Sequence, residues 1–330
     1  MNEPGYRPRR AARHPPDGVR DPAGISARAP VCEHRRVITI GLVLSAGGPV
    51  GDPWHAGVLA ALTEATGWDA RRADLVVGTS AGAISAVGLR AGLSATDRWL
   101  DHLGRQPSPE GRAVLDRLRT PWSEESTPRR LRPQDPVLTL RALWPPWRPR
   151  PVEAFTGLLP PGARRADALA VRMRELHPEP WPAEPTWITA VRLGDGRRVV
   201  FGRDDVPADV GAAVQASAAI PGVYAPVEIG GHRYVDGGVH SATNADLCAP
   251  LGFDLVVVSS VMTLPAPGVS TPLTREALHP VRARCSLRLG AEVAEIRRRG
   301  TPVLVVQPAL DQLPALDRDG DPAEVRRRAA

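Results

Sequence analysis

The sequence has no lysine, only three cysteines and few aromatic residues among its 330 positions. All 42 basic residues are arginine, which together with abundant Ala, Gly and Pro indicates a GC-rich bacterial genome more than a special function. Cys32, Cys248 and Cys285 have no paired spacing, which argues against a disulfide scaffold and favours a reducing compartment. Neither CxxC nor HExxH occurs, so we expect no zinc site and no cofactor.

Long hydrophobic runs are also missing. No segment approaches the roughly 20 uncharged apolar residues that span a bilayer. The basic N-terminus is not followed by the apolar run of a secretory signal. We therefore expect a cytoplasmic protein whose contact with an anionic membrane would be peripheral.

The net charge of +6 is unevenly distributed. Residues 1–36 carry +4 and residues 104–150 carry +5, which leaves −3 for the rest of the chain. The part that should carry the chemistry is thus slightly acidic. This argues against a general nucleic-acid-binding protein, and we expect no specific nucleic-acid partner.

Composition also divides the chain into domains. Residues 1–36 are rich in Arg, Pro, Ala and Gly without periodicity, which predicts a disordered leader. Residues 37–310 form the predicted catalytic domain. Within it, residues 104–150 hold nine Pro, ten Arg and three Trp, which predicts a cap insertion with short helices at most. The charged composition of residues 311–330 predicts a loose tail.

Strand and helix patterns alternate through the predicted domain, as they do in a parallel α/β sheet. Short apolar or β-branched runs predict strands at 37–44, 73–78, 186–193, 197–202, 232–238, 254–260 and 301–308. Helical spacing predicts helices at 54–65, 81–92, 208–219 and 273–299. The fold class is therefore α/β with a mainly parallel central sheet.

The first motif with chemical meaning is GTSAG, which stands between a predicted strand and a predicted helix. Small residues at Gly78 and Gly82 allow a sharp turn that raises Ser80 to the positive end of the following helix. That placement favours a nucleophilic serine. The alternative is a plain strand-to-helix turn with Ser80 as its N-cap.

Two further glycine motifs flank predicted strands. The turn SAGGPVG includes Gly47, Gly48 and Gly51, and its amides could gather around an oxyanion or a phosphate, or the turn could serve packing alone. Asp236 precedes Gly237 and Gly238 at the end of another predicted strand. In a parallel sheet, Asp236 would point to the same carboxyl edge as Ser80.

These motifs, in this order, resemble those of the patatin-like phospholipases. The blocks at 41–62, 74–86 and 216–247 carry the resemblance, which extends in outline over 37–308 with a poor match through 104–185. The resemblance implies a three-layer α/β/α fold and a serine acyl-ester hydrolase, such as a phospholipase A, a lysophospholipase or a non-specific lipid acyl hydrolase. Its substrate would be a lipid or a small acyl ester.

The resemblance also implies roles for single residues. Ser80 would be the nucleophile, Asp236 its base, and the amides of Gly47 and Gly48 the oxyanion hole. A dry site would raise the pKa of the carboxyl from its usual value near 4 and make it a better base. The sequence departs from the family pattern at Val50, where an arginine is usual. This removes a cation that could bind a phosphate headgroup.

Two alternatives stay open at this point. An α/β-hydrolase with a Ser-His-Asp triad would use His240 or His279, since both follow the serine and the acid. A non-catalytic, Arg-rich binding protein on a hydrolase fold would explain the basic segments but not the three motifs together. Outside a triad, His55, His232 and His240 are expected to be structural or exposed.

Overall fold

The computed structural model describes residues 38–128, 131–144, 146–147, 150–264, 280–309 and 311–316, with 327 and 330. The predicted leader, Cys32 and His279 lie outside the described residues. The division of the chain into leader, catalytic domain and tail stays a prediction. Within the predicted tail, Leu313 and Leu316 are buried, and the carbonyl of Ala330 accepts a hydrogen bond from the Trp99 indole.

The apolar runs form one sheet of eight strands within the described residues, in the order β10-β9-β1-β2-β5-β8-β7, with β6 paired to β5. Consecutive neighbours from β10 to β5 are parallel. These strands are β1 (Ile40–Leu44), β2 (Leu75–Thr79), β5 (Thr186–Arg192), β9 (Leu255–Ser259) and β10 (Val303–Val306). Their β-branched residues suit strands that are buried on both faces.

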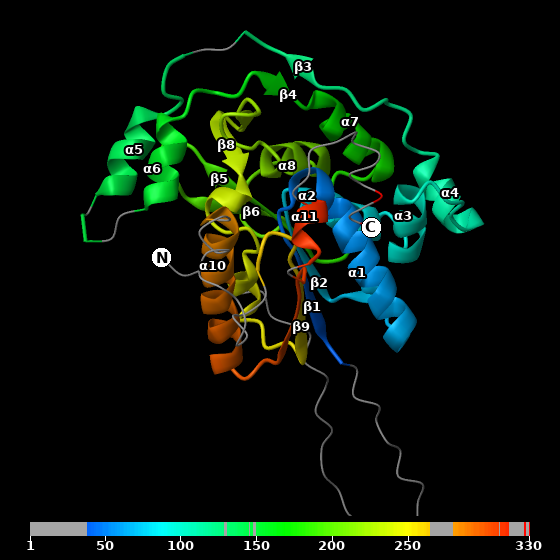
Figure 1. The fold of residues 1–330 in the computed structure, drawn as a ribbon. Helices are drawn as coiled ribbons and strands as arrows, with labels where there is room; N and C mark the ends of the chain where they lie inside the picture. The colour runs from blue at the N-terminus through cyan, green and yellow to red at the C-terminus, as the bar shows by residue number, and fades with distance from the viewer. Residues whose placement is uncertain are drawn as a thin grey trace, which may run out of the picture. The chain divides into compact units, whose positions relative to one another are not determined.

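Helices cover both faces of the sheet, which confirms the predicted three-layer α/β/α fold. Leu42 and Leu44 of β1 pack with Leu59 on one face, whereas Val43 packs with Val293 on the other. Figure 1 shows α1 and α10 on opposite sides of β1, β2 and β9. The first face carries α1 (Gly51–Thr66), α2 (Ala81–Arg90), α3 (Ala95–His102), α7 (Asp167–Leu176) and α8 (Val210–Ser217). The second carries η4 (Ala245–Cys248) and α10 (Pro280–Arg298).

One end of the sheet is antiparallel, which corrects the expected setting of Asp236. Strand β8 (His232–Asp236) runs antiparallel to β5 and pairs Asp236 with Ala190. On β2, the residue before Ser80 pairs with Thr189 of β5. Strand β8 therefore begins beyond the carboxyl edge of the parallel strands and runs back toward it. Asp236, at the end of β8, lies level with Ser80. Strands β6 (Arg198–Phe201) and β7 (Val227–Ile229) complete this end.

The predicted cap contains short helices, as its composition suggested, together with one short strand. It holds α4 (Pro109–Leu115), the two-residue strand β3 (Glu125–Ser126) and α5 (Pro136–Leu143). Strand β3 pairs with β4 (Arg164–Arg165), and α5 packs against α6 (Pro151–Leu158). Pro136 and Pro151 stand in the first turns of α5 and α6, where the missing N–H costs nothing. Prolines therefore begin these helices rather than break them.

The short elements η1 (Gly48–Val50), η2 (Ala70–Arg72), η3 (Gly237–Val239) and α11 (Leu313–Leu316) complete the described secondary structure. None of the helices in the described part of the chain is long and apolar enough to cross a bilayer.

Candidate active site

Ser80 occupies the turn between β2 and α2 in a strained backbone conformation, with φ of 55° and ψ of −118°. Such a positive φ is rare for a residue with a side chain. The motif glycines make the turn possible, because a Cβ on Gly78 would lie 2.6 Å from the Ala83 Cα and one on Gly82 would clash with the Leu44 carbonyl. The Ser80 amide donates to the Ser217 hydroxyl at 2.8 Å. This bond on its own N–H helps hold the strained residue in place.

Asp236 ends β8 beside the Ser80 hydroxyl. Its side chain accepts the Gly238 N–H at 2.7 Å, and only 5% of the residue is exposed. Burial raises the pKa of Asp236 to about 6, against the hydrogen bonds from Gly238 and the Ser80 side chain. A carboxylate with this pKa is ionised at pH 7 but is a stronger base than an exposed aspartate.

Close packing explains the two glycines after Asp236. A Cβ on Gly237 would clash with the Thr189 side chain on the neighbouring strand, and one on Gly238 would lie 3.0 Å from the Asp236 carboxylate. The absence of side chains thus lets the turn fold back onto the carboxyl group.

The glycine-rich turn after β1 lines the same cavity as Ser80. A Cβ on Gly51 would lie 2.5 Å from the Ala81 Cβ, so the turn packs directly against the start of α2. Gly47 has no room for a side chain, and Gly48 has φ of 54° and faces open space. Both of their amides are without a partner in the described part of the chain.

The buried His55 ring links the start of this turn to strand β9. Its Nε2 lies 2.8 Å from the Ser45 carbonyl oxygen, and its Nδ1 lies 2.8 Å from the Ser259 hydroxyl on β9. Burial lowers the pKa of His55 to about 4, so the ring is neutral at pH 7. His55 is therefore structural, in keeping with its sequence interpretation.

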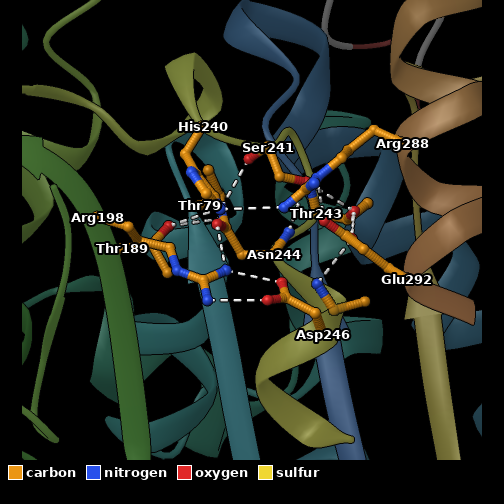
Figure 2. Close-up of polar contacts among 11 residues, drawn as sticks. Thr79, Thr189, Arg198, His240, Ser241, Thr243, Asn244, Asp246, Arg288 and Glu292 are labelled. Carbon is orange, nitrogen blue, oxygen red and sulfur yellow. Dashed lines mark hydrogen bonds and ion pairs between the residues drawn. The ribbon is translucent and has the colours of Figure 1, made fainter. Parts of the chain in front are cut away.

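A polar network joins the loop at Ser241 and Asn244 to Thr79, the residue before Ser80, and to Thr189 (Figure 2). The Asn244 side-chain amide donates to the hydroxyls of Thr79 and Thr189 at 3.1 and 3.2 Å, and to the Ser241 carbonyl at 2.6 Å. Nearby, the Ala46 amide donates to the Ala242 carbonyl at 2.7 Å. One loop thus contacts the residue before the serine and the residue before Gly47.

The same network joins His240 to Arg288. Its Nε2 lies 3.1 Å from the Arg288 guanidinium, and burial, with Arg198 and Arg288 nearby, lowers the pKa of His240 to about 4. Figure 2 shows His240 and Arg288 on the side of the network away from Asp246. A triad histidine would have to bond both the serine and the acid. Among the described contacts, His240 bonds neither Ser80 nor Asp236.

The cavity beside Ser80 has a volume of about 1390 Å³. This exceeds the roughly 300–1,000 Å³ of most small-ligand pockets. Its inner wall is largely apolar and comes from α2, α4, α7 and their flanking loops, with Leu89, Leu93, Leu115, Leu118, Leu169 and Met173. Val50 is buried against Val261 and Leu316 and lines the cavity, so the position where the sequence resemblance implies an arginine adds to its apolar surface.

A buried ion cluster stands in one wall of the cavity. Asp52 accepts hydrogen bonds from the Arg98 guanidinium, the Ser85 hydroxyl at 2.6 Å and the His102 ring at 3.0 Å. Burial alone would raise the pKa of Asp52, but these three partners hold it well below its usual range. The cluster ties α1 to α2 and α3 and keeps the cavity wall in place.

Several of these residues had no sequence signal of their own. Ser217 and Asn244 lie inside the block at 216–247, but no spacing marks either as a partner of the Ser80 turn. The Asp52 cluster joins residues up to 50 positions apart. Within the described residues no group of three or more His, Cys, Asp or Glu could hold a metal ion. The metal-free mechanism itself stays a prediction.

The comparisons with known proteins concern the region that holds these motifs. A family model described as Patatin-like phospholipase matches residues 42–249. A solved structure, VipD from Legionella pneumophila, is similar at 16% identity with a TM-score of 0.37, over 73% of this chain and 52% of that chain. The chain thus spans about half the length of that neighbour. No curated protein sequence matches the chain.

Proposed function

The chain belongs to the patatin-like phospholipase family, and from this premise we propose that it is a serine acyl-ester hydrolase with Ser80 as nucleophile and Asp236 as base. The family is one of lipid acyl hydrolases. The assignment of Ser80 as nucleophile and Asp236 as base rests on one observation: the strained Ser80 lies beside a buried carboxyl group with a pKa of about 6. We further propose that the substrate is a lipid ester, because the cavity is large and its inner wall is apolar.

The first half of the reaction acylates the serine. Asp236 accepts the Ser80 proton as the hydroxyl oxygen attacks the acyl carbonyl. The resulting oxyanion receives the amide N–H groups of Gly47 and Gly48, and the positive end of α2 adds to its stabilisation. Collapse of the tetrahedral intermediate breaks the ester bond, and protonated Asp236 gives its proton to the leaving alcohol.

The second half restores the enzyme. Asp236, again ionised, takes a proton from water while the water oxygen attacks the acyl-enzyme carbonyl. The same amides hold the second oxyanion, and Ser80 leaves with the proton from Asp236. Each residue therefore performs one task twice, and the mechanism needs no metal. The Ser80 strain and the Gly238 bond keep the two groups aligned between the halves.

The contacts of His240 favour the dyad over a triad, since that ring bonds Arg288 instead of the serine or the acid. A purely binding role would leave the strained serine and the raised carboxyl pKa without a purpose. We also propose a cytoplasmic location, which accords with the free thiols of Cys248 and Cys285.

Labelling with a fluorophosphonate probe tests the proposal directly. Wild-type protein should be labelled at Ser80 and should hydrolyse p-nitrophenyl esters, whereas Ser80→Ala should do neither and keep its unfolding midpoint. Turnover is expected to fall by several orders of magnitude, because the nucleophile is lost. Unchanged turnover in purified Ser80→Ala protein would reject the mechanism. A series of phospholipids, lysophospholipids and simple esters then identifies the substrate.

A further inference from the structure

The α5–α6 hairpin, here residues 131–160, presents an unusually apolar outer surface. Trp147, Trp144 and Leu140 are 76%, 72% and 71% exposed. The two indole rings lie 6.5 Å apart between centroids, so they form one patch. The other exposed large apolar side chains of the hairpin are Leu131, Val137, Leu143, Phe155 and Leu158. Single exposed apolar residues are ordinary, but so many within one helical hairpin mark a candidate interaction site.

The hairpin has a separate inner face that already supplies its packing. Leu138 is fully buried in a cluster with Val191, Val235 and Val239, and Val152 packs against the same cluster. The Thr139 hydroxyl donates to a carbonyl of α6, which joins the two helices. The outer side chains are therefore not needed to hold the hairpin in place. These outer side chains are available to contact a partner.

The charges of the hairpin restrict that partner. Both of its acids, Asp135 and Glu153, are buried, whereas Arg132 and Arg141 are exposed. The described outer surface thus combines apolar side chains with positive charge and has no exposed acid. A surface that is apolar, rich in Trp and edged by Arg is complementary to the interface of an anionic bilayer.

We propose that the outer face of the α5–α6 hairpin docks the protein onto an anionic lipid bilayer. Trp rings favour the headgroup level, and arginines beside them gain from anionic lipid. A symmetric second copy fits less well, because the same patch would meet itself and oppose arginines without an acid to pair with them. The proposal extends the lipid hydrolase function above but does not need catalysis.

The docking surface is separate from the cavity beside Ser80. The inner face of the hairpin packs against β8 and η3, the two elements that carry Asp236 and the glycines after it. None of residues 131–160 belongs to the lining of the cavity. Docking at the outer face would therefore leave that lining uncovered.

Vesicle binding by catalytically inactive full-length protein tests the proposal. All proteins carry Ser80→Ala, so that no lipid is consumed, and all keep residues 1–36, so that their charge contributes equally. Phosphatidylcholine vesicles with and without phosphatidylglycerol are compared by co-sedimentation and by the shift of tryptophan emission. We expect tighter binding to the anionic vesicles, weakened when salt is raised from about 0.1 M to about 1 M.

Two paired variants then assign the binding to the hairpin. Trp144→Ser with Trp147→Ser should weaken binding to both kinds of vesicle by about tenfold or more, because the rings no longer enter the interface. Arg132→Ala with Arg141→Ala should weaken binding to the anionic vesicles by about thirtyfold and leave binding to neutral ones almost unchanged. Because the Arg141 guanidinium also donates to the Gly194 carbonyl, Arg132→Ala alone, with an expected loss of about fivefold, tests the charge with that bond intact.

Matched controls change similar side chains elsewhere. Leu287→Ser removes a side chain that is 78% exposed on α10, and Arg105→Ala with Arg112→Ala removes two exposed arginines near α4. These proteins should bind like the parent, and all should share its unfolding midpoint.

The proposal is overturned if the hairpin variants bind vesicles as the parent does, or no more weakly than the controls. It is also overturned if the parent forms a dimer in solution that the hairpin variants lose, since the patch would then meet a second copy. Because binding is measured without turnover, a failure of the hydrolase proposal would leave this result unchanged.

Discussion

Replacing Asp236 by Asn separates the catalytic role of the carboxylate from its cost to the fold. The amide oxygen can still accept the Gly238 N–H, which lies at 2.7 Å. It cannot take the Ser80 proton. We expect turnover to fall nearly as far as in Ser80→Ala, while the variant becomes more stable than the wild type at neutral pH.

The magnitude follows from the raised pKa. Burial shifts the pKa of Asp236 from 3.8 to about 6, so the folded state holds the proton more tightly than the unfolded state. That stabilisation is fully present below about pH 4 and is lost as the pH rises through about 6. The shift corresponds to about 3 kcal/mol. Above pH 6 the neutral amide side chain of the variant does not incur this loss of stability. The thermal unfolding midpoint of Asp236→Asn should then be up to about 6 °C higher than that of the wild type.

Urea unfolding of both proteins at about pH 4, 6 and 8 checks the sign of the stability difference, because these values span the unfolded-state and folded-state pKa of Asp236. The stability gap should widen mainly between about pH 4 and pH 6, and slightly further by about pH 8 as Asp236 completes its ionisation in the folded state. Asp246→Asn is a matched control with the opposite sign, because the Arg198 hydrogen bonds and charge overcome burial and lower the pKa of Asp246. A gap that does not change with pH would refute the raised pKa of Asp236. Retained turnover in Asp236→Asn would refute its role as base.

Four further outcomes are expected. Ser80→Gly should be more stable than Ser80→Ala by about 1 kcal/mol in urea unfolding, because glycine tolerates the positive φ; equal stabilities would show no strain at the turn. His240→Ala should keep turnover within about tenfold of the wild type, and a loss as large as that of Asp236→Asn would restore the triad. Met173→Trp should shift ester preference to shorter acyl chains by filling the cavity wall, with an unaltered chain-length profile as the contrary result. Chelation by EDTA should leave turnover unchanged, and activity restored by one divalent ion would contradict the metal-free mechanism.

The sequence alone determined the fold class and the order of the motifs. Short β-branched runs predict buried parallel strands, and glycine and serine predict the turns at helix starts. Both features depend on local backbone preference and burial, which the sequence shows directly. The same local patterns singled out Ser80 and Asp236. Their roles stay predictions that labelling and turnover will test.

Only the tertiary structure decided how these segments meet. Whether β8 runs with or against β5 depends on pairing across the sheet, and no residue within 232–238 encodes that direction. The ties from Ser217 and Asn244 to the Ser80 turn span 137 and 165 positions. The raised pKa of Asp236 exists only once other elements exclude water from it. Likewise, the Trp and Arg content of residues 104–150 was visible in the sequence, but only packing decided that Leu138 turns inward while Trp144 and Trp147 remain exposed.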